Sequence, residues 1–344
     1  MKRLMFIELA LPNVVYSLFW IFTLCSTTAI AVGAEDGDPA AQYLVAGARR
    51  PVSVPEGYLI TPFGYFHPSC VQSLSVGESM LPDGRLQHAD GSVAPTVAIC
   101  DYPHYTPTGL LFGALETSRS GQHTANAEGL PPPEVSGWLE NANVTTGTAI
   151  KSYGAMVTTW TVPADPAADD GQVLFFFPGF EDIGDSATSI LQPVLTWASK
   201  QWTITSWNCC LSGIVTSSPS VNVAPGDKIF GSVTSTCASG TLTCQTWNVL
   251  SVDLTTGKST ILANTPSDAQ VFNWAFGAVA EPYYVISCND FPTGGGLTFS
   301  GITLFNQNLE AVAKPAWSKA IDTSATPTCK YGVTDSATSV TVDF

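Results

Sequence analysis

The sequence predicts an all-β protein: an antiparallel β-sandwich of the lectin-like or glucanase-like jelly-roll kind, with a smaller N-terminal segment of strands and loops. Short runs rich in β-branched and aromatic residues repeat along most of the chain. Turn signals such as Pro-Gly-Asp, Thr-Gly-Lys and Gly-Gly-Gly separate these runs at intervals of about 8–15 residues, a spacing typical of sandwiches and barrels. No stretch of helical periodicity and convincing length competes with them.

The predicted strands concentrate in the middle of the chain. Each is a short apolar or alternating run, bounded by Gly, Pro or Asp. They are residues 155–162, 173–178, 189–197, 202–207, 228–235, 246–254, 274–280, 283–288 and 297–305, and the chain ends in the strand-like SVTVDF.

The first 34 residues read as a signal peptide. They begin with Met1-Lys2-Arg3, continue through an uncharged apolar run and end on small residues before the acidic Glu35. This order of basic start, apolar middle and small-residue exit is that of a secretory signal. An uncleaved membrane anchor is the alternative, because the apolar run is nearly long enough to span a bilayer. We expect cleavage, secretion and no membrane association afterwards.

Eight cysteines remain once Cys25 leaves with the signal, and in an exported chain they predict up to four disulfides. None has CxxC spacing and the histidines are not in a zinc-ligand pattern, so no metal and no other cofactor is expected. We expect Cys237 to pair with Cys244 and Cys70 with Cys100. The adjacent Cys209 and Cys210 are expected to pair with Cys288 and Cys329, in an order that the sequence does not assign.

Three parts follow the signal. Residues 35–130 are rich in Gly, Pro and turn pairs and contain all four histidines, with the dibasic Arg49-Arg50 near their start. Pro131-Pro132-Pro133 then forms a stiff linker. Residues 135–319 contain the predicted strands, and residues 320–344 form a tail tethered by Cys329. We interpret residues 35–130 as an accessory segment or pro-segment that covers the β domain.

Charge and composition exclude several functions. The net charge is −15 with only 13 Lys and Arg, too few cations to neutralise a nucleic-acid backbone. Between residues 135 and 319 there is no His and no Arg. Nucleophile systems that need His and His-ligated metals are therefore absent from this part of the chain. Carboxylates, assisted by amides, remain for acid–base chemistry.

This part of the chain contains four glutamates. Glu140 and Glu310 stand among Asn and turn residues and are expected to be solvated. Glu181 lies in the acidic FPGFEDIGD segment, which reads as a solvated loop or a weak calcium site. Glu281 interrupts the apolar run WAFGAVAEPYYVIS, so its carboxyl is expected to be buried with a raised pKa or to face a cleft. A functional role and a purely structural, hydrogen-bonded role are equally open for Glu281.

Gln192 poses a similar question. The period-two alternation of a strand places Ile190, Gln192 and Val194 on one face and Leu191 and Leu195 on the other. An amide among apolar neighbours either satisfies a buried backbone group or lines a groove.

Five segments in order resemble the glutamic peptidases, the acid-acting Glu/Gln peptidases of fungi, and more loosely the neprosin-type glutamic peptidases. The resemblance covers roughly residues 153–305. YGAMVTTWTVP is similar to the family's opening strand, VLFFFPGFED to its aromatic–Gly–acid segment, and SVNVAPGDKIFGSV to a strand, turn and strand. ILQPVLTW resembles the motif with the catalytic Gln, and WAFGAVAEPYYV the strand with the catalytic Glu. The separation of Gln192 and Glu281 is near the family's spacing.

The resemblance implies a secreted acid endopeptidase that acts on protein or peptide substrates. Glu281 would be the general base that activates water, and Gln192 would donate its amide N–H to the oxyanion. Phe177 and Glu181 would bind substrate. Two departures stand out: Cys209 occupies the place of an expected supporting Glu, and Pro282 follows Glu281 inside a strand. A monomer is expected.

Two other functions are compatible with a sandwich. One is a non-enzymatic carbohydrate-binding module whose exposed tryptophans stack on sugars. The other is a glycan-cleaving enzyme that uses Glu181 and Glu281 as paired carboxylates. A peptidase is favoured if Gln192 and Glu281 face each other. A glycosidase is favoured if Glu181 faces Glu281. If neither pair of side chains meets, a carbohydrate-binding module is favoured.

Overall fold

The computed structural model describes residues 50–81, 83–95, 100–111, 137–148, 150–182, 189–210, 213–267 and 270–344. The predicted signal peptide, Arg49 and the triple-proline linker lie outside the described residues, so these predictions stay predictions. Within the described part, no helix is both long and apolar enough to cross a bilayer.

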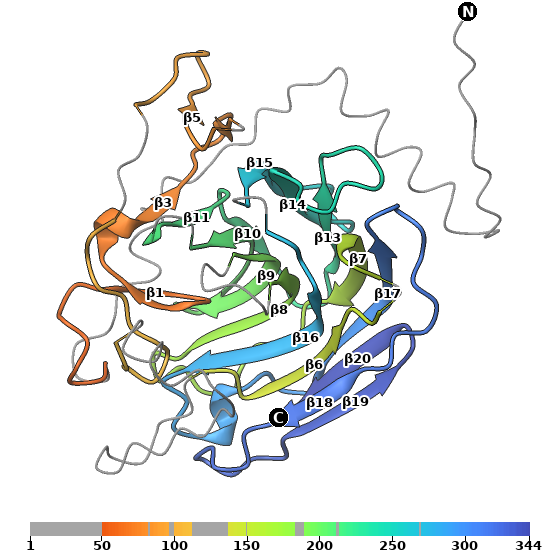
Figure 1. Cartoon of the computed structure of the whole chain (residues 1–344). Coiled ribbons are helices and arrows are strands. Elements are labelled where there is room, and N and C mark those ends of the chain that lie inside the picture. The colour runs from red at the N-terminus through yellow and green to blue at the C-terminus, as the bar shows by residue number, and fades with distance from the viewer. Residues whose placement is uncertain are drawn as a thin grey trace, which may run out of the picture. The chain divides into compact units, whose positions relative to one another are not determined.

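Two large sheets dominate the described part of the chain, and their strands are almost all antiparallel (Figure 1). The larger, nine-stranded sheet runs in the order β18 (Ser318–Ile321), β6 (Glu140–Thr145), β16 (Trp274–Tyr283), β8 (Val173–Glu181), β9 (Ile190–Ala198), β10 (Gln201–Cys209), β11 (Val215–Ser217) and β3 (Val71–Ser73), with β12 (Val221–Val223) also paired to β10. The one parallel pair among these strands is β11 with β3.

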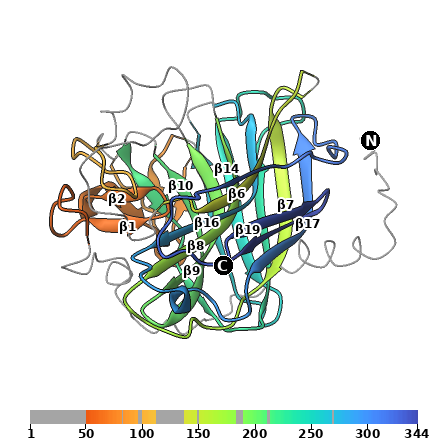
Figure 2. The ribbon, with the colours of Figure 1, turned by 90° about the horizontal axis from the view of Figure 1, so that it is seen from below.

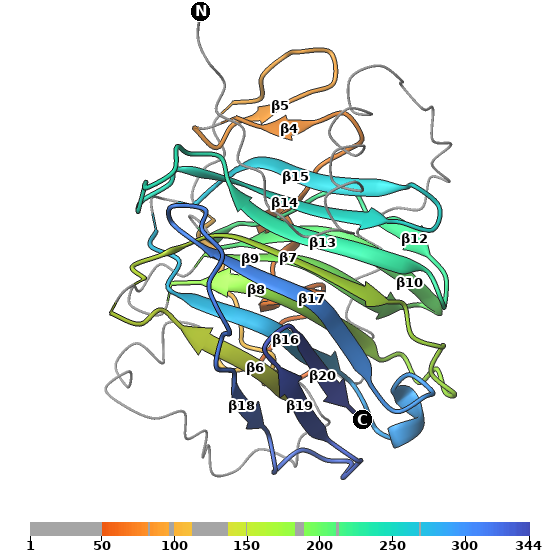
Figure 3. The ribbon, with the colours of Figure 1, turned by 90° about the vertical axis from the view of Figure 1, so that its right-hand side faces the viewer.

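The second sheet has seven strands and faces the viewer in Figure 3. Its order is β15 (Ser259–Pro266), β14 (Thr246–Asp253), β13 (Lys228–Ser235), β7 (Tyr153–Thr161), β17 (Leu297–Asn306), β20 (Ser339–Asp343) and β19 (Gly332–Ser336). The expected all-β sandwich is confirmed.

The main core lies between the two sheets. Because successive residues of a strand point to opposite faces, every second residue of β8 and β9 enters this core, including Phe176, Phe180, Leu191 and Leu195. Their neighbours in sequence point the other way. We call the face of the nine-stranded sheet that is turned away from the seven-stranded sheet its outer face.

The outer face is apolar too, and the N-terminal segment packs on it (Figure 2). Its side chains include Phe175, Phe177 and Trp207 of the sheet, and Ile60 and Tyr65 from the segment. We call the described part of residues 50–111 the cover. It contains β1 (Leu59–Thr61), β2 (Gly64–Phe66), the short 3₁₀ helix η3 (Pro68–Cys70), β3, β4 (Ser79–Met80) and β5 (Leu86–Gln87).

The cover is built into the sandwich and is not a detached unit. Its β3 extends the nine-stranded sheet, and Leu74 and Met80 reach the core between the two sheets. Val54 and Tyr58 are buried in the apolar cluster on the outer face. Loss of the cover would therefore expose much apolar surface of the sheet.

Most predicted strands are present within one or a few residues of the predicted bounds. The exception is the run 283–288, because β16 continues from Trp274 through Glu281 and Pro282 and ends at Tyr283. Pro282 is tolerated because Pro282 C=O, on the β6 side, accepts from the N–H of Gly137, which lies before β6 begins. The missing N–H of Pro282 points to that same side and so costs no ladder bond with β8.

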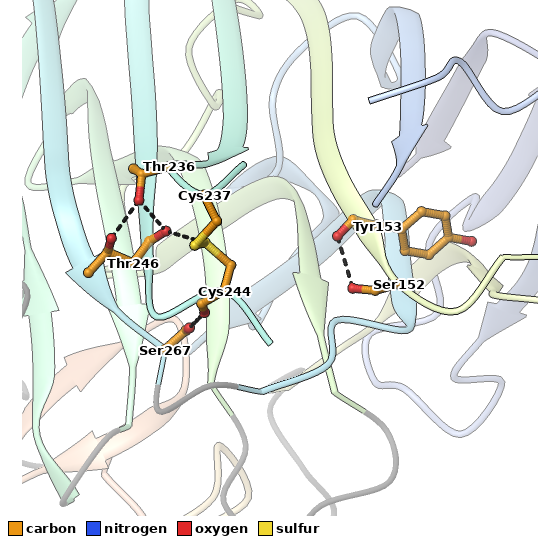
Figure 4. The surroundings of a disulfide bond; sticks show 7 residues. All are labelled: Ser152, Tyr153, Thr236, Cys237, Cys244, Thr246 and Ser267. Atoms are coloured by element: carbon orange, nitrogen blue, oxygen red, sulfur yellow. Dashed lines mark hydrogen bonds between the residues drawn. A yellow bond between two sulfur atoms is a disulfide. The ribbon is translucent and has the colours of Figure 1, made fainter. Parts of the chain in front are cut away.

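Four disulfides join the eight cysteines. The predicted Cys70–Cys100 and Cys237–Cys244 bridges are confirmed. Figure 4 shows the second of these beside Thr236 and Thr246, at the connection between β13 and β14. The prediction for the other four was wrong: Cys209 pairs with its neighbour Cys210, and Cys288 pairs with Cys329. The Cys288–Cys329 bridge tethers the C-terminal part of the chain to η6 (Cys288–Asp290).

The expectation that Glu140 is solvated was wrong, whereas Glu310 is exposed as expected. Glu140 begins β6 and its side chain is 0% exposed. Burial raises the pKa of Glu140 to about 8, and repulsion by the Asp343 carboxylate adds to this. The backbone groups at Gly332 and Asp343 offset part of the shift, although among the described residues neither carboxyl oxygen makes a hydrogen bond of ordinary geometry.

This buried acid predicts how stability depends on pH. The pKa of Glu140 is about 8 in the folded protein and near 4.5 when the group is solvated. The folded state therefore binds the proton more tightly, and stability falls as pH rises through this window, by at most about 1.4 kcal/mol per pH unit. Thermal melts of Glu140→Gln should lose this part of the slope, and the wild-type midpoint at pH 3 should not lie far below that at pH 7. A much lower midpoint at pH 3, or an unchanged slope in Glu140→Gln, contradicts this prediction.

Candidate functional site

Glu281 lies on the outer face of the nine-stranded sheet. It is in β16, opposite Phe175 of β8, and its side chain is 0% exposed. The indole Nε1 of Trp138 donates to Glu281 Oε2 at 3.1 Å, and the hydroxyl oxygen of Tyr283 lies 2.9 Å from Oε1. Both carboxyl oxygens therefore have a partner, as expected for a buried polar group.

The environment of Glu281 favours the neutral acid. Burial raises the pKa of Glu281 well above its ordinary value, and the contacts with Tyr283 and Trp138 oppose this only in part. None of the groups that shift this pKa is a cation. The expectation of a buried carboxyl with a raised pKa is confirmed.

Gln192 lies on the same face, as the alternation of β9 predicted: Val194 is in the outer cluster, while Leu191 and Leu195 are in the core between the sheets. The side chain of Gln192 is 0% exposed, and neither its oxygen nor its nitrogen has a hydrogen-bond partner among the described residues. Across the ladder it pairs with Trp207 of β10. On the β8 side it lies beside Gly179, where a Cβ would be 3.2 Å from Gln192 Cβ.

Gln192 and Glu281 are not level with each other. Phe175, which is opposite Glu281, is itself opposite Thr196 of β9, four residues along the strand from Gln192. This offset is about 13 Å along the strands, and the two intervening strand spacings add about 10 Å across them. One water reaches about 6 Å between two polar atoms, so it cannot bridge these side chains in this arrangement.

The two residues expected to bind substrate lie on β8. Phe177 is buried on the outer face, and the indole of Trp138 packs against it edge to face, with ring centroids 6.1 Å apart. Glu181 is partly buried at the end of β8, opposite Trp274. It is diagonal to Gln192 across the β8–β9 pair, a geometry within reach of long side chains.

Glu181 does not face Glu281. The two are six residues apart along β8, because Glu281 is opposite Phe175 and Glu181 is opposite Trp274. Six residues correspond to about 20 Å, whereas paired carboxylates of glycosidases are about 5–10 Å apart. The next residue, Asp182, accepts from the backbone N–H of Val271 and from Asn273 Nδ2, so it organises the loop before β16.

Sequence reasoning missed Trp138, Tyr283 and the hairpin of the cover. Tyr283 is two residues after Glu281, and the period-two rule places both on one face of β16, so a signal for it was available. Trp138 lies before β6 and comes from a segment without a strand pattern. The β1–β2 hairpin approaches from a part of the sequence about 220 residues away, which no local pattern indicates.

The tip of this hairpin touches the surroundings of both predicted catalytic residues. Its Thr61 C=O is 3.0 Å from the hydroxyl oxygen of Tyr283, the partner of Glu281. Its Phe63 ring packs edge to face on Trp207, which pairs with Gln192. The cover thus reaches both predicted catalytic positions.

Comparisons with known proteins give structural likeness only. No protein-family model matches the chain. No curated protein matches it either. Among solved structures, scytalido-glutamic peptidase with a peptide-based transition-state analogue is 17% identical and has a TM-score of 0.44, covering 61% of this chain and 98% of its own.

Two further structures come from the same group of enzymes. SCP-B, a member of the eqolisin family in complex with the tripeptide Ala-Ile-His, is 16% identical with a TM-score of 0.44, covering 61% of this chain and 98% of its own. Aspergilloglutamic peptidase from Aspergillus niger is 20% identical with a TM-score of 0.35, covering 50% and 98%. The family that the sequence motifs resemble is thus also the family of these similar structures.

The amide of Gln192, which has no hydrogen-bond partner among the described residues, gives a test of its role. A buried amide without partners costs stability, about 1–3 kcal/mol for such a group. Gln192→Met keeps the length and removes the polar atoms, so it should raise the free energy of unfolding by this order in urea denaturation. A loss of stability in Gln192→Met would mean that the amide is needed for the fold.

Proposed function

We propose that this chain is the covered precursor of a secreted acid endopeptidase of the glutamic type, with Glu281 as its general base. The observation that carries the proposal is the burial of Glu281 on the outer face of the sheet, beneath a segment of the same chain and with no cation among the described groups that shift its pKa. Strongly shifted carboxyls of this kind gather at functional sites. The motifs ILQPVLTW and WAFGAVAEPYYV support the choice of reaction class.

The acid–base chemistry follows from the position of Glu281. Once a groove opens over the sheet, an ionised Glu281 takes a proton from a bound water, which attacks the peptide carbonyl carbon. The same carboxyl then gives the proton to the leaving amine. Burial causes the raised pKa of Glu281 under the cover, so opening the groove lowers this pKa and allows the carboxyl to ionise.

Two donors compete for the oxyanion. The motif resemblance assigns this role to Gln192, which the register holds about 13 Å along the strands from Glu281. The hydroxyl of Tyr283 is much closer to Glu281 and belongs to the same strand. If Gln192 is the donor, its side chain must move closer to Glu281 when the cover leaves. If Tyr283 is the donor, Gln192 binds the peptide farther along the groove, together with Phe177 and Glu181.

Neither pair of side chains forms in the described structure, which is the outcome given above as favouring a carbohydrate-binding module, but the positions of the tryptophans do not support that alternative. A sugar-stacking surface needs exposed aromatic rings, and no tryptophan in the described part of the chain is exposed. Trp160, Trp197 and Trp207 are core residues, and Trp138 and Trp274 are half-buried against each other and Phe276.

The first test measures cleavage of a denatured protein between pH 2 and 8 by the secreted chain after processing. Glu281→Gln keeps the volume and removes the proton acceptor, so activity should fall by about 10²–10⁴-fold. Glu140→Gln is the matched control, because Glu140 is equally buried but lies on the core side of the same sheet; it should retain activity. Equal losses in both variants would contradict the assignment of Glu281.

The oxyanion donor is tested in the same assay. Loss of one such donor costs about 10²–10³-fold in turnover. If Gln192 is the donor, Gln192→Ala shows this loss in kcat; if it binds the peptide, the loss falls on KM. Glu181→Gln should leave cleavage largely intact, since Glu181 is far from Glu281 along β8. A large loss in Glu181→Gln would instead favour a pair formed by Glu181 and Gln192.

A specific protease site placed at Pro131–Pro133 allows cutting between the cover and the sandwich. The intact chain should be inactive at every pH, because the hairpin tip occupies the site, and activity should appear with the processed species on a gel. An intact chain that cleaves substrate at once, with no processed species, would contradict this role.

A further inference from the structure

One short motif of the chain has no part in the chemistry described above. Asn143-Val144-Thr145 is the only Asn-x-Ser/Thr triplet, with x other than Pro, in the whole sequence. In a chain that enters the secretory pathway, this triplet is the acceptor for an N-linked glycan. Because such a glycan is bulky and hydrophilic, the asparagine must lie where the fold leaves room for it. The position of Asn143 in the sheet therefore decides whether the triplet can be used.

Asn143 points away from the core between the two sheets. It is in β6, where Ala142 is buried in that core and Val144 packs against it. The alternation of a strand therefore directs Asn143 and Thr145 to the outer face. With the cover in place, Asn143 is half-buried and Thr145 is exposed. A substituent on the Asn143 amide can thus extend into water without disturbing the core.

The amide nitrogen of Asn143 keeps its structural contact after such a substitution. Nδ2 of an asparagine carries two hydrogens. Asn143 Nδ2 donates to Asn141 Oδ1 at 2.7 Å, which uses one of them. An N-linked sugar replaces one hydrogen and leaves the other. The hydrogen bond to Asn141 is therefore compatible with a glycan on Asn143.

The topology of the sheet keeps the triplet accessible during synthesis. In the folded protein β6 pairs with β16 and β18, which follow it in the sequence by about 130 and 175 residues. At a synthesis rate of about 5–20 residues per second, β6 waits about 6 s or longer for its first partner strand. Since the ladder cannot form before the partner strand exists, the glycosylating transferase meets Asn143 in unpaired chain.

We propose that Asn143 is N-glycosylated. A bond forms between Asn143 Nδ2 and the anomeric carbon of the first sugar of an oligosaccharide carried on a lipid diphosphate. The bond between that carbon and the diphosphate oxygen breaks, the lipid diphosphate leaves, and a base of the transferase takes the proton from Nδ2. Of the proposed function, this step requires only that the chain is secreted.

The glycan stands beside the candidate groove and not over Glu281. Asn143 is opposite Phe276 of β16, which is opposite Gly179 of β8, the neighbour of Gln192. Asn143 and Gln192 are therefore in one row, about 14 Å apart across three strand spacings. Along β6, Asn143 is four positions from the level of Glu281, or about 13 Å. Loss of the glycan should therefore leave cleavage that depends on Glu281 in place.

The test uses the full-length chain secreted by a eukaryotic host. An amidase that releases N-linked glycans converts the sugar-bearing Asn to Asp, and in heavy-oxygen water it labels that Asp. Trypsin then releases the peptide 120–151, whose asparagines are Asn126, Asn141 and Asn143. We expect faster migration on a gel after the amidase, and the label at position 143 alone. A secreted chain whose peptide carries no label at position 143 would overturn the inference.

Four variants separate the triplet from its surroundings. Asn143→Gln and Thr145→Ala each destroy the acceptor and should abolish the mobility shift. Thr145→Ser preserves the acceptor and should keep the shift. Asn141→Gln is the matched control, because Asn141 lies on the same strand and face but outside the triplet; it should keep the shift too.

A mobility shift that persists in both Asn143→Gln and Thr145→Ala would place the modification elsewhere and overturn the inference. If Asn143→Gln is not secreted, Thr145→Ala carries the test, because Thr145 is exposed. A glycan at Asn143 on a chain that cleaves no peptide would support the inference and contradict only the proposed function.

Discussion

The burial of the Glu281 carboxyl, with no cation beside it among the described residues, is the constraint on which the candidate site depends. Removing a carboxyl from water is costly unless it is neutral and hydrogen-bonded. Trp138, just before β6, and Tyr283 of β16 hydrogen-bond the carboxyl, and Thr61 of the cover in turn contacts the hydroxyl of Tyr283. One side chain thus links three segments that are far apart in sequence. Glu140 is buried on the opposite face of the same sheet and shows that a raised pKa alone does not define a site.

Much of the sandwich was predictable from sequence because its signals are local. The alternation in ILQPVLTW gave the correct face for Gln192, Leu191 and Leu195, and the apolar run around Glu281 correctly indicated a buried acid. Among the strands after the cover, β6, β11, β15, β18 and β19 were not predicted; β11 and β18 have only three and four residues, which carry too little pattern. The end of β16 was misplaced because residues 283–288 are as apolar as a strand.

The rest depends on contacts between distant segments. The expectation of a solvated Glu140 followed from its neighbours Asn141 and Asn143, whereas its burial follows from how the C-terminal strands β19 and β20 pack beside β6. The pairing of Cys209 with Cys210 could not be chosen from spacing. Strand register, which separates Gln192 from Glu281 by four residues, is set by the ladders of β8 with β9 and β16. Sequence separation alone does not contain that information.

The most direct measurement is a crystal structure of the processed chain with a peptide that mimics the tetrahedral intermediate. We expect that the β1–β2 hairpin has left the outer face and that the tetrahedral carbon lies over β16, with a hydroxyl within hydrogen-bond distance of the Glu281 carboxyl. A peptide bound elsewhere on the sandwich, with Glu281 still beneath Tyr283 and Thr61, would contradict it.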